Sequence, residues 1–110
     1  RFWIVSVHLH WPWPYQQADH VQLLLPILDK FQGPAVMAGD FNMVRWANSV
    51  KRMSDILGVK AAGPMTGSYV GLSGLLPLPI DHVFSTLGGR VAPRPAAGSD
   101  HLGLLAEVAL

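Results

Sequence analysis

Val36-Met37-Ala38-Gly39-Asp40-Phe41-Asn42 is the stretch that decides the fold of this chain. An apolar run leads into a glycine, and an acid and an amide follow with one apolar residue between them. On a β-strand alternate side chains point to the same face, so we expect Asp40 and Asn42 to share a face while Phe41 turns into the core. Such a strand end could present two polar groups to a cleft, or the acid and the amide could simply form a turn.

Acid–imidazole pairs stand at the edges of two further apolar runs, Ile80-Asp81-His82 and Ser99-Asp100-His101. Carboxylates at the ends of buried strands are costly unless they are paired or bind a metal. Because only 14% of the residues are charged, acids in three such places indicate one shared site. The chemistry that fits is hydrolysis assisted by a hard divalent ion, since carboxylate oxygens bind Mg²⁺ and orient water.

Length and composition restrict the class of protein. A chain of 110 residues forms one domain at most. The net charge is +1, whereas a dedicated nucleic-acid binder usually has a strongly basic surface. The absence of cysteine excludes disulfides and thiolate metal sites but leaves the compartment open. The chain starts without Met inside a strand-like run, so we expect it to be a fragment of a longer protein.

The patterning predicts a strand, helix, strand unit followed by a second helix and further strands. Pro26 is expected to kink the first helix, and Gly58 to end the second. Gly88-Gly89 is expected to form a turn. We predict strands over 2–9, 35–39, 80–85 and 102–108, a weak strand from 91, helices over 17–31 and 46–57, and a long loop over 58–79.

The segment Trp11-Pro12-Trp13-Pro14-Tyr15 directly follows the first predicted strand. Two prolines remove backbone donors and favour extended geometry at the residues before them, so the segment is predicted to be an irregular loop. Its aromatic side chains could form a lid on the hydrophobic core or one wall of a binding cleft.

Four motifs resemble, in their order along the chain, the endonuclease/exonuclease/phosphatase superfamily, which includes pancreatic deoxyribonuclease, neutral sphingomyelinases and inositol polyphosphate 5-phosphatases. The motifs are His8-Leu9, Gly39-Asp40-Phe41-Asn42, Ile80-Asp81-His82-Val83-Phe84 and Ser99-Asp100-His101. The similarity extends over nearly the whole chain but over only the C-terminal half of the family's domain. It implies an α+β fold, namely half of a four-layer α/β/β/α sandwich, with one mixed β-sheet and two helices on one face.

The resemblance assigns roles on the phosphate side of the site. It implies that His8 contacts the scissile phosphate, a role for which His10 is less suited. Asp40 would orient the attacking water or help to hold a metal. Asn42 would steady the phosphate in the transition state.

The resemblance also implies a second group of residues. Asp81 would hydrogen-bond one ring nitrogen of His101 and fix its tautomer, while Asp100 would bind the metal, Mg²⁺ or Mn²⁺. His82 lies on the opposite strand face from Asp81, so we interpret it as a packed or partly exposed histidine. The family's metal-binding Glu comes from its N-terminal half, and Glu107, the only Glu here, lies well past the site.

The parent protein is therefore predicted to be a metal-dependent phosphoester hydrolase, a nuclease or phosphatase acting on nucleic acid, a lipid-linked phosphate or a small phosphate. This chain alone is predicted to bind the metal weakly and to be inactive. The competing interpretation is a non-catalytic interaction module or half of a pseudoenzyme. The sheet face without helices predicts an apolar contact with the missing N-terminal half or, between identical chains, a homodimer.

Overall fold

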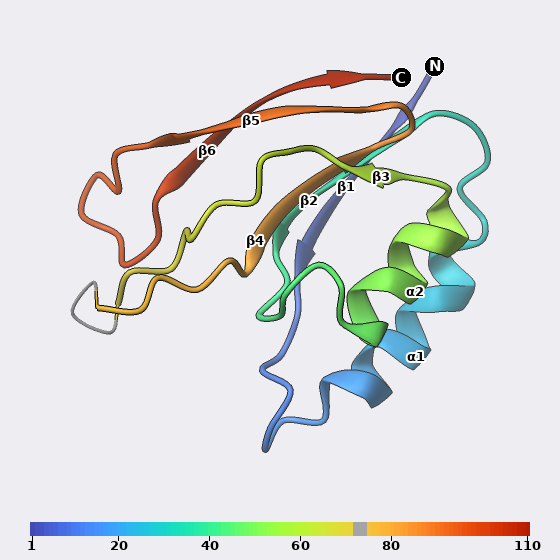
Figure 1. Cartoon of the computed structure of the whole chain (residues 1–110). Coiled ribbons are helices and arrows are strands. Elements are labelled where there is room, and N and C mark those ends of the chain that lie inside the picture. Colours follow the sequence, from blue (N-terminus) through green and yellow to red (C-terminus); the bar gives the residue numbers. More distant parts are fainter. Residues whose placement is uncertain (72–74) are drawn as a thin grey trace.

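A computed structural model describes residues 1–71 and 75–110 of the chain, which form two helices and two β-sheets (Figure 1). The elements in chain order are β1 (Trp3–His8), α1 (Gln17–Leu28), β2 (Ala35–Asp40), α2 (Asn48–Leu57), β3 (Lys60–Ala61), β4 (Asp81–Ser85), β5 (Gly88–Arg94) and β6 (Gly103–Ala109).

The larger sheet has the strand order β1-β2-β4-β3. β1 and β2 are parallel and joined by α1, as the predicted strand, helix, strand unit requires, whereas β4 runs antiparallel to β2 and β3. In this register His8 lies opposite Asp40, and Asp40 lies opposite Asp81. The pairing therefore places three predicted site residues in one row across three strands.

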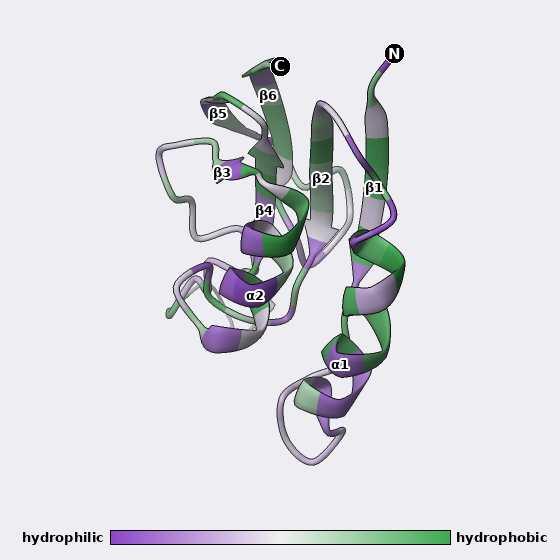
Figure 2. Ribbon diagram, turned by 90° about the vertical axis from the view of Figure 1, so that its right-hand side faces the viewer, coloured by the Kyte–Doolittle hydropathy of each residue, from purple (hydrophilic) through white to green (hydrophobic). Residues whose placement is uncertain are grey.

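Both helices cover the same face of the larger sheet (Figures 1 and 2). Met37 of β2 and Phe84 of β4 lie opposite each other and are buried in the core that the helices close. Val50 and Met53 of α2 are fully buried, as their spacing predicts. Trp46, the first residue of the helix predicted over 46–57, is 63% exposed, because α2 begins only at Asn48. Gly58 ends α2 in the left-handed conformation (φ 68°), as predicted.

The C-terminal strands correct the expectation of a single sheet. β5 and β6 form a separate two-stranded sheet, and an isolated bridge joins Arg90 of β5 to Gly63 on the other edge of this strand. The turn falls at Thr86–Leu87, and Gly88 and Gly89 begin β5 instead of forming it. A Cβ on Gly89 would overlap the carbonyl oxygen of Glu107, so the glycine allows the two backbones to approach. Pro93 fits within β5 because, among the described residues, no strand pairs with this part of β5 on the edge opposite β6.

The α+β fold, with a mixed sheet and two helices on one of its faces, is thus the one predicted. Residues 62–71 and 75–79 are irregular apart from isolated bridges, as expected for the long loop. Among the described residues, no helix has the length and apolar character that crossing a membrane requires.

Candidate functional site

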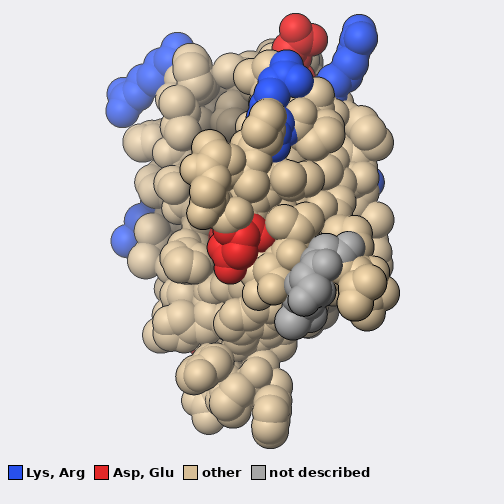
Figure 3. Space-filling view, turned by 90° about the vertical axis from the view of Figure 1, so that its left-hand side faces the viewer, with Lys and Arg blue, Asp and Glu red and all other residues tan. Residues whose placement is uncertain are grey.

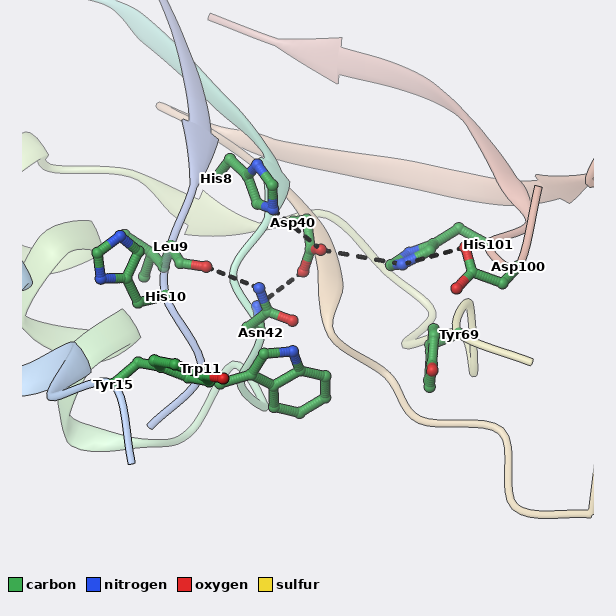
Figure 4. Close-up of a pocket in the computed structure, with 10 residues that line it drawn as sticks. All are labelled: His8, Leu9, His10, Trp11, Tyr15, Asp40, Asn42, Tyr69, Asp100 and His101. Atoms are coloured by element: carbon green, nitrogen blue, oxygen red, sulfur yellow. Dashed lines mark hydrogen bonds and ion pairs between the residues drawn. The ribbon is translucent and has the colours of Figure 1, made fainter. Parts of the chain in front are cut away.

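A pocket of about 360 Å³ opens where β1 and β2 end beside the segment that precedes β6 (Figure 4). The predicted site residues that line it are His8, Asp40, Asn42, Asp100 and His101. The remaining members of its lining are Leu9, His10, Trp11, Tyr15 and Tyr69. The structure thus brings together residues that are up to 93 positions apart in the sequence, from His8 to His101.

The imidazole of His101 forms a hydrogen bond with Asp81 through Nδ1, as predicted. Nδ1 of His101 lies 2.7 Å from Oδ2 of Asp81, and the same oxygen accepts a hydrogen bond of 2.6 Å from Oγ of the buried Ser68. A carboxylate partner requires a proton on Nδ1, so this pair fixes the tautomer of the neutral ring. Nε2 is then directed to the pocket, 3.9 Å from Asp40 and 4.0 Å from Asp100.

Asp40 lies between two imidazoles. Its Oδ1 accepts a hydrogen bond of 2.8 Å from the backbone N–H of Asn42. Its Oδ2 is 3.8 Å from Nε2 of His8 and 3.9 Å from Nε2 of His101. These separations are too long for direct hydrogen bonds. One carboxylate oxygen therefore binds the backbone of the segment after β2, while the other lies between the two imidazoles.

Asn42 is buried and has a left-handed backbone (φ 48°), a conformation that asparagine tolerates better than most residues. Its Nδ2 donates a hydrogen bond of 2.6 Å to the carbonyl of Leu9. The amide carries a second N–H, so the predicted contact with a phosphate oxygen is compatible with this bond. Phe41 between the two polar residues is fully buried, as the strand pattern predicts.

The two histidines that follow acids have opposite electrostatic environments. Burial alone lowers the pKa of His101, but the hydrogen bond to Asp81 and the charges of Asp81, Asp40 and Asp100 outweigh it and raise its pKa above 6.5. His82 is packed on the helix side against Phe41 and is bonded to the carbonyl of Met43, and burial lowers its pKa below 6.5. This confirms the interpretation of His82 as a packed histidine.

The first testable prediction follows from these pKa shifts. In metal-free buffer, the NMR titration of His101 is expected to have its midpoint above 6.5 and that of His82 below it. Asp81→Asn is expected to lower the pKa of His101 without a comparable effect on His82. Because the pKa of His101 is raised, its contribution to stability is complete below pH 6.5 and is lost as the pH rises through the folded-state pKa. Equal midpoints for both rings would contradict the arrangement.

Some of the side chains around the pocket are suited to bind a hard cation. Ligand atoms of Asp40, Asp81 and His101 all lie within 4.8 Å of one another. Oδ2 of Asp81 already accepts two hydrogen bonds, whereas Oδ2 of Asp40 accepts none from the part of the chain that the structure describes. The side chain of Asp100 is 63% exposed. Figure 3 shows acidic side chains in the middle of the face that it draws, and no Lys or Arg of the described residues adjoins them. Asp40 and Asp100 therefore remain our prediction for the metal ligands, and Glu107 on β6 pairs opposite Arg90, away from the pocket.

The aromatic loop forms a wall of the pocket. Trp11 and Tyr15 line it, whereas Trp13 is 85% exposed, so the loop does not close the hydrophobic core. Tyr69 completes the wall, with its ring 5.0 Å from that of His101 and 6.4 Å from that of Trp11. Sequence reasoning missed Tyr69 and Ser68, since both lie in a loop without periodicity or a motif that could have identified them.

Residues 1–101 match the sequence model of the Endonuclease/Exonuclease/phosphatase family. A search of curated proteins found no match.

Two solved structures share the fold. An endonuclease/exonuclease/phosphatase family protein from Leptotrichia buccalis C-1013-b superposes with a TM-score of 0.63 at 20% identity, covering 97% of this chain and 48% of that one. Beta toxin 275-280 from Staphylococcus aureus gives 0.58 at 17% identity, covering 96% of this chain and 52% of that one. The chain thus spans about half the length of both. With a sequence match over residues 1–101 and this shared fold, the chain belongs to the endonuclease/exonuclease/phosphatase family.

Proposed function

We propose that this pocket hydrolyses phosphoesters with Mg²⁺ or Mn²⁺ in a domain completed by a second, N-terminal half. The observation that carries the proposal is the convergence on Oδ2 of Asp40 of two imidazole nitrogens, from His8 at 3.8 Å and from His101 at 3.9 Å. A carboxylate flanked by two imidazoles suits a reaction in which a water is oriented and charge on a phosphate must be stabilised.

Each residue has a distinct part in this proposal. Asp40 accepts a hydrogen bond from the attacking water through Oδ2. Protonated His101, held by Asp81, donates from Nε2 to a phosphate oxygen, and the free N–H of Asn42 donates to another. His8, with a side chain that is 81% exposed, contacts the phosphate from the solvent side. A cation held by Asp40 and Asp100 would supply Lewis-acid stabilisation of the phosphate charge.

The test is hydrolysis of chromogenic mono- and diesters, p-nitrophenyl phosphate and bis-p-nitrophenyl phosphate. We expect a polypeptide that also contains the N-terminal half to hydrolyse one of them in a Mg²⁺- or Mn²⁺-dependent way that EDTA abolishes. The 110-residue chain alone is expected to be inactive, because Asp40 and Asp100 offer Mg²⁺ too few oxygens. If the completed domain is inactive on both esters and on a nucleic acid and a lipid phosphate, the non-catalytic interpretation is correct.

The face opposite the helices supports the proposed partner. Ile4 of β1 is 75% exposed there, and Val36, Ala38 and Val83 are only partly buried. Figure 2 shows apolar residues along both β1 and β2. Exposed apolar surface is unfavourable at about 25 cal/mol per Å². We propose that the N-terminal half covers this face in the complete domain, and that a second copy covers it in the isolated chain.

This proposal predicts the oligomeric state of the chain. Light scattering at micromolar concentration is expected to show a dimer, and Ile4→Asp to shift it to a monomer without unfolding it, because Ile4 contributes little burial within one chain. Leu23→Asp is the matched control, since Leu23 is 73% exposed on α1. A monomeric wild-type chain, or dissociation by the control substitution, would show that this face is not the contact.

A further inference from the structure

Gln17, the first residue of α1, is a polar side chain that the chemistry described so far does not use. It is 1% exposed and belongs to the largest fully buried side chains of the protein. Its Nε2 donates two hydrogen bonds, of 2.7 Å to the carbonyl of His10 and of 2.8 Å to the carbonyl of Phe41. One amide group therefore joins the segment after β1 to the segment after β2.

These bonds lie where the sheet itself no longer holds the two segments together. The β1–β2 pairing ends at His8 and Asp40. Beyond it, the N–H of Leu9 donates to the carbonyl of Asp40 at 3.0 Å, and Nδ2 of Asn42 donates to the carbonyl of Leu9 at 2.6 Å. Gln17 adds the outermost link. Its two acceptors each adjoin pocket residues, His10 after Leu9 and Phe41 between Asp40 and Asn42.

The amide orientation is determined by its partners. Both neighbours are carbonyl oxygens, which only the NH₂ end can satisfy, so the exchange of Oε1 and Nε2 is excluded. Oε1 is buried without a hydrogen-bond partner among the described residues. An unpaired buried acceptor costs about 1–3 kcal/mol.

Backbone strain lies at both segments that Gln17 joins. Gln16, immediately before it, has φ 55°, and Asn42, immediately after its acceptor Phe41, has φ 48°. Left-handed conformations in non-glycine residues persist only where the surroundings hold them, and they cluster at functional sites. The Gln17 bonds are part of the surroundings that hold these two.

We propose that Gln17 is a positioning residue that sets the distance between the His8 segment and the Asp40–Asn42 segment, and thereby the alignment of His8 and Asn42 on the substrate phosphate. This inference rests on the proposed hydrolytic function. It acts through backbone carbonyls, so Gln17 itself touches neither the substrate nor the cation. Displacement of a catalytic group by about 1 Å can lower the rate a hundredfold.

The test compares Gln17→Met with Gln22→Met in the completed domain. Met has nearly the shape of Gln but no donor, and Gln22 lies on the same helix, where its Oε1 accepts an exposed hydrogen bond from Arg52. We expect Gln17→Met to lower kcat about tenfold or more with KM within about threefold. Gln22→Met is expected to leave both unchanged. In NMR spectra of the folded variants, the side-chain amide signal of Asn42 should shift only in Gln17→Met.

A kcat in Gln17→Met equal to that of wild type, per folded molecule, would overturn the inference, as would an unshifted Asn42 signal. If Gln17→Met does not fold, Gln17→Ala provides the decision, because it removes both hydrogen bonds without burying a charge and leaves space in which water can bond to the two carbonyls. Full activity in folded Gln17→Ala would also overturn it. An inactive wild-type domain is the separate failure of the proposed function, and the NMR comparison still tests Gln17 in that case.

Discussion

Asp40→Asn is expected to lower kcat for phosphoester hydrolysis in the completed domain by at least about a thousandfold, or roughly 4 kcal/mol in the barrier. The substitution keeps an acceptor at the position of Oδ1, so the hydrogen bond from the Asn42 N–H survives. It removes the negative charge between His8 and His101 that would orient the water and attract the cation. Asp40→Ala should be equally inactive.

Folding of Asp40→Asn should be nearly intact, because the side chain lies at the end of β2 and outside the apolar core. A thermal melt close to that of wild type checks this. Asp55→Asn is the matched control, since Asp55 makes an exposed ion pair with Lys51 on α2, and such pairs contribute little. Residual activity of Asp40→Asn within tenfold of wild type would refute the role of Asp40 as the water-orienting group.

Gly39→Ala is expected to be the most destabilising single substitution near the site, by more than about 3 kcal/mol. Gly39 has φ 144°, which residues with a Cβ rarely adopt, and a Cβ there would overlap the carbonyl oxygen of Val7 in β1. Val7 lies directly opposite Gly39 in the parallel pairing. Relief of the overlap would have to separate β1 from β2 next to the His8–Asp40 pair.

Chemical denaturation of Gly39→Ala and Gly58→Ala separates the cost of the left-handed backbone from the cost of the steric overlap with β1. Gly58 also has a positive φ, of 68°, but nothing lies within 4 Å of a Cβ placed on it. Its replacement should cost only the left-handed strain of about 1 kcal/mol. The difference between the two variants measures the steric conflict with β1. Equal losses would mean that β1 and β2 can move apart freely, and that the glycine is needed for its backbone angles alone.

Local patterns were sufficient for the elements and for the candidate residues. The apolar runs over 35–39 and 80–85 predicted β2 and β4, because a short apolar run bounded by turn residues is typical of a buried strand. The spacing of Val50 and Met53 predicted α2, because residues three apart lie on the same face of a helix. Gly58 predicted its end, because glycine readily adopts the left-handed conformation in which many helices end. The motif order indicated the family before any coordinates.

Sequence patterns were insufficient where the structure depends on pairing between segments that are distant in the sequence. The separate β5–β6 sheet could not be foreseen, because the role of Gly88 and Gly89 depends on the approach of β6 rather than on their neighbours in sequence. Ser68 and Tyr69 stand in a loop without periodicity, and their contacts with Asp81 and His101 exist only in the folded chain.

By itself, the sequence determined the α+β class, the strand–helix–strand unit and the acids and imidazoles available for chemistry, because these depend on periodicity and residue type. Only the tertiary structure decided that His8, Asp40 and Asp81 stand in one row, that Nε2 of His101 is directed to the pocket, and that Gln17 joins the segment of His10 to that of Phe41. Such relations are set by strand register and by hydrogen bonds between distant segments, and no local pattern records them.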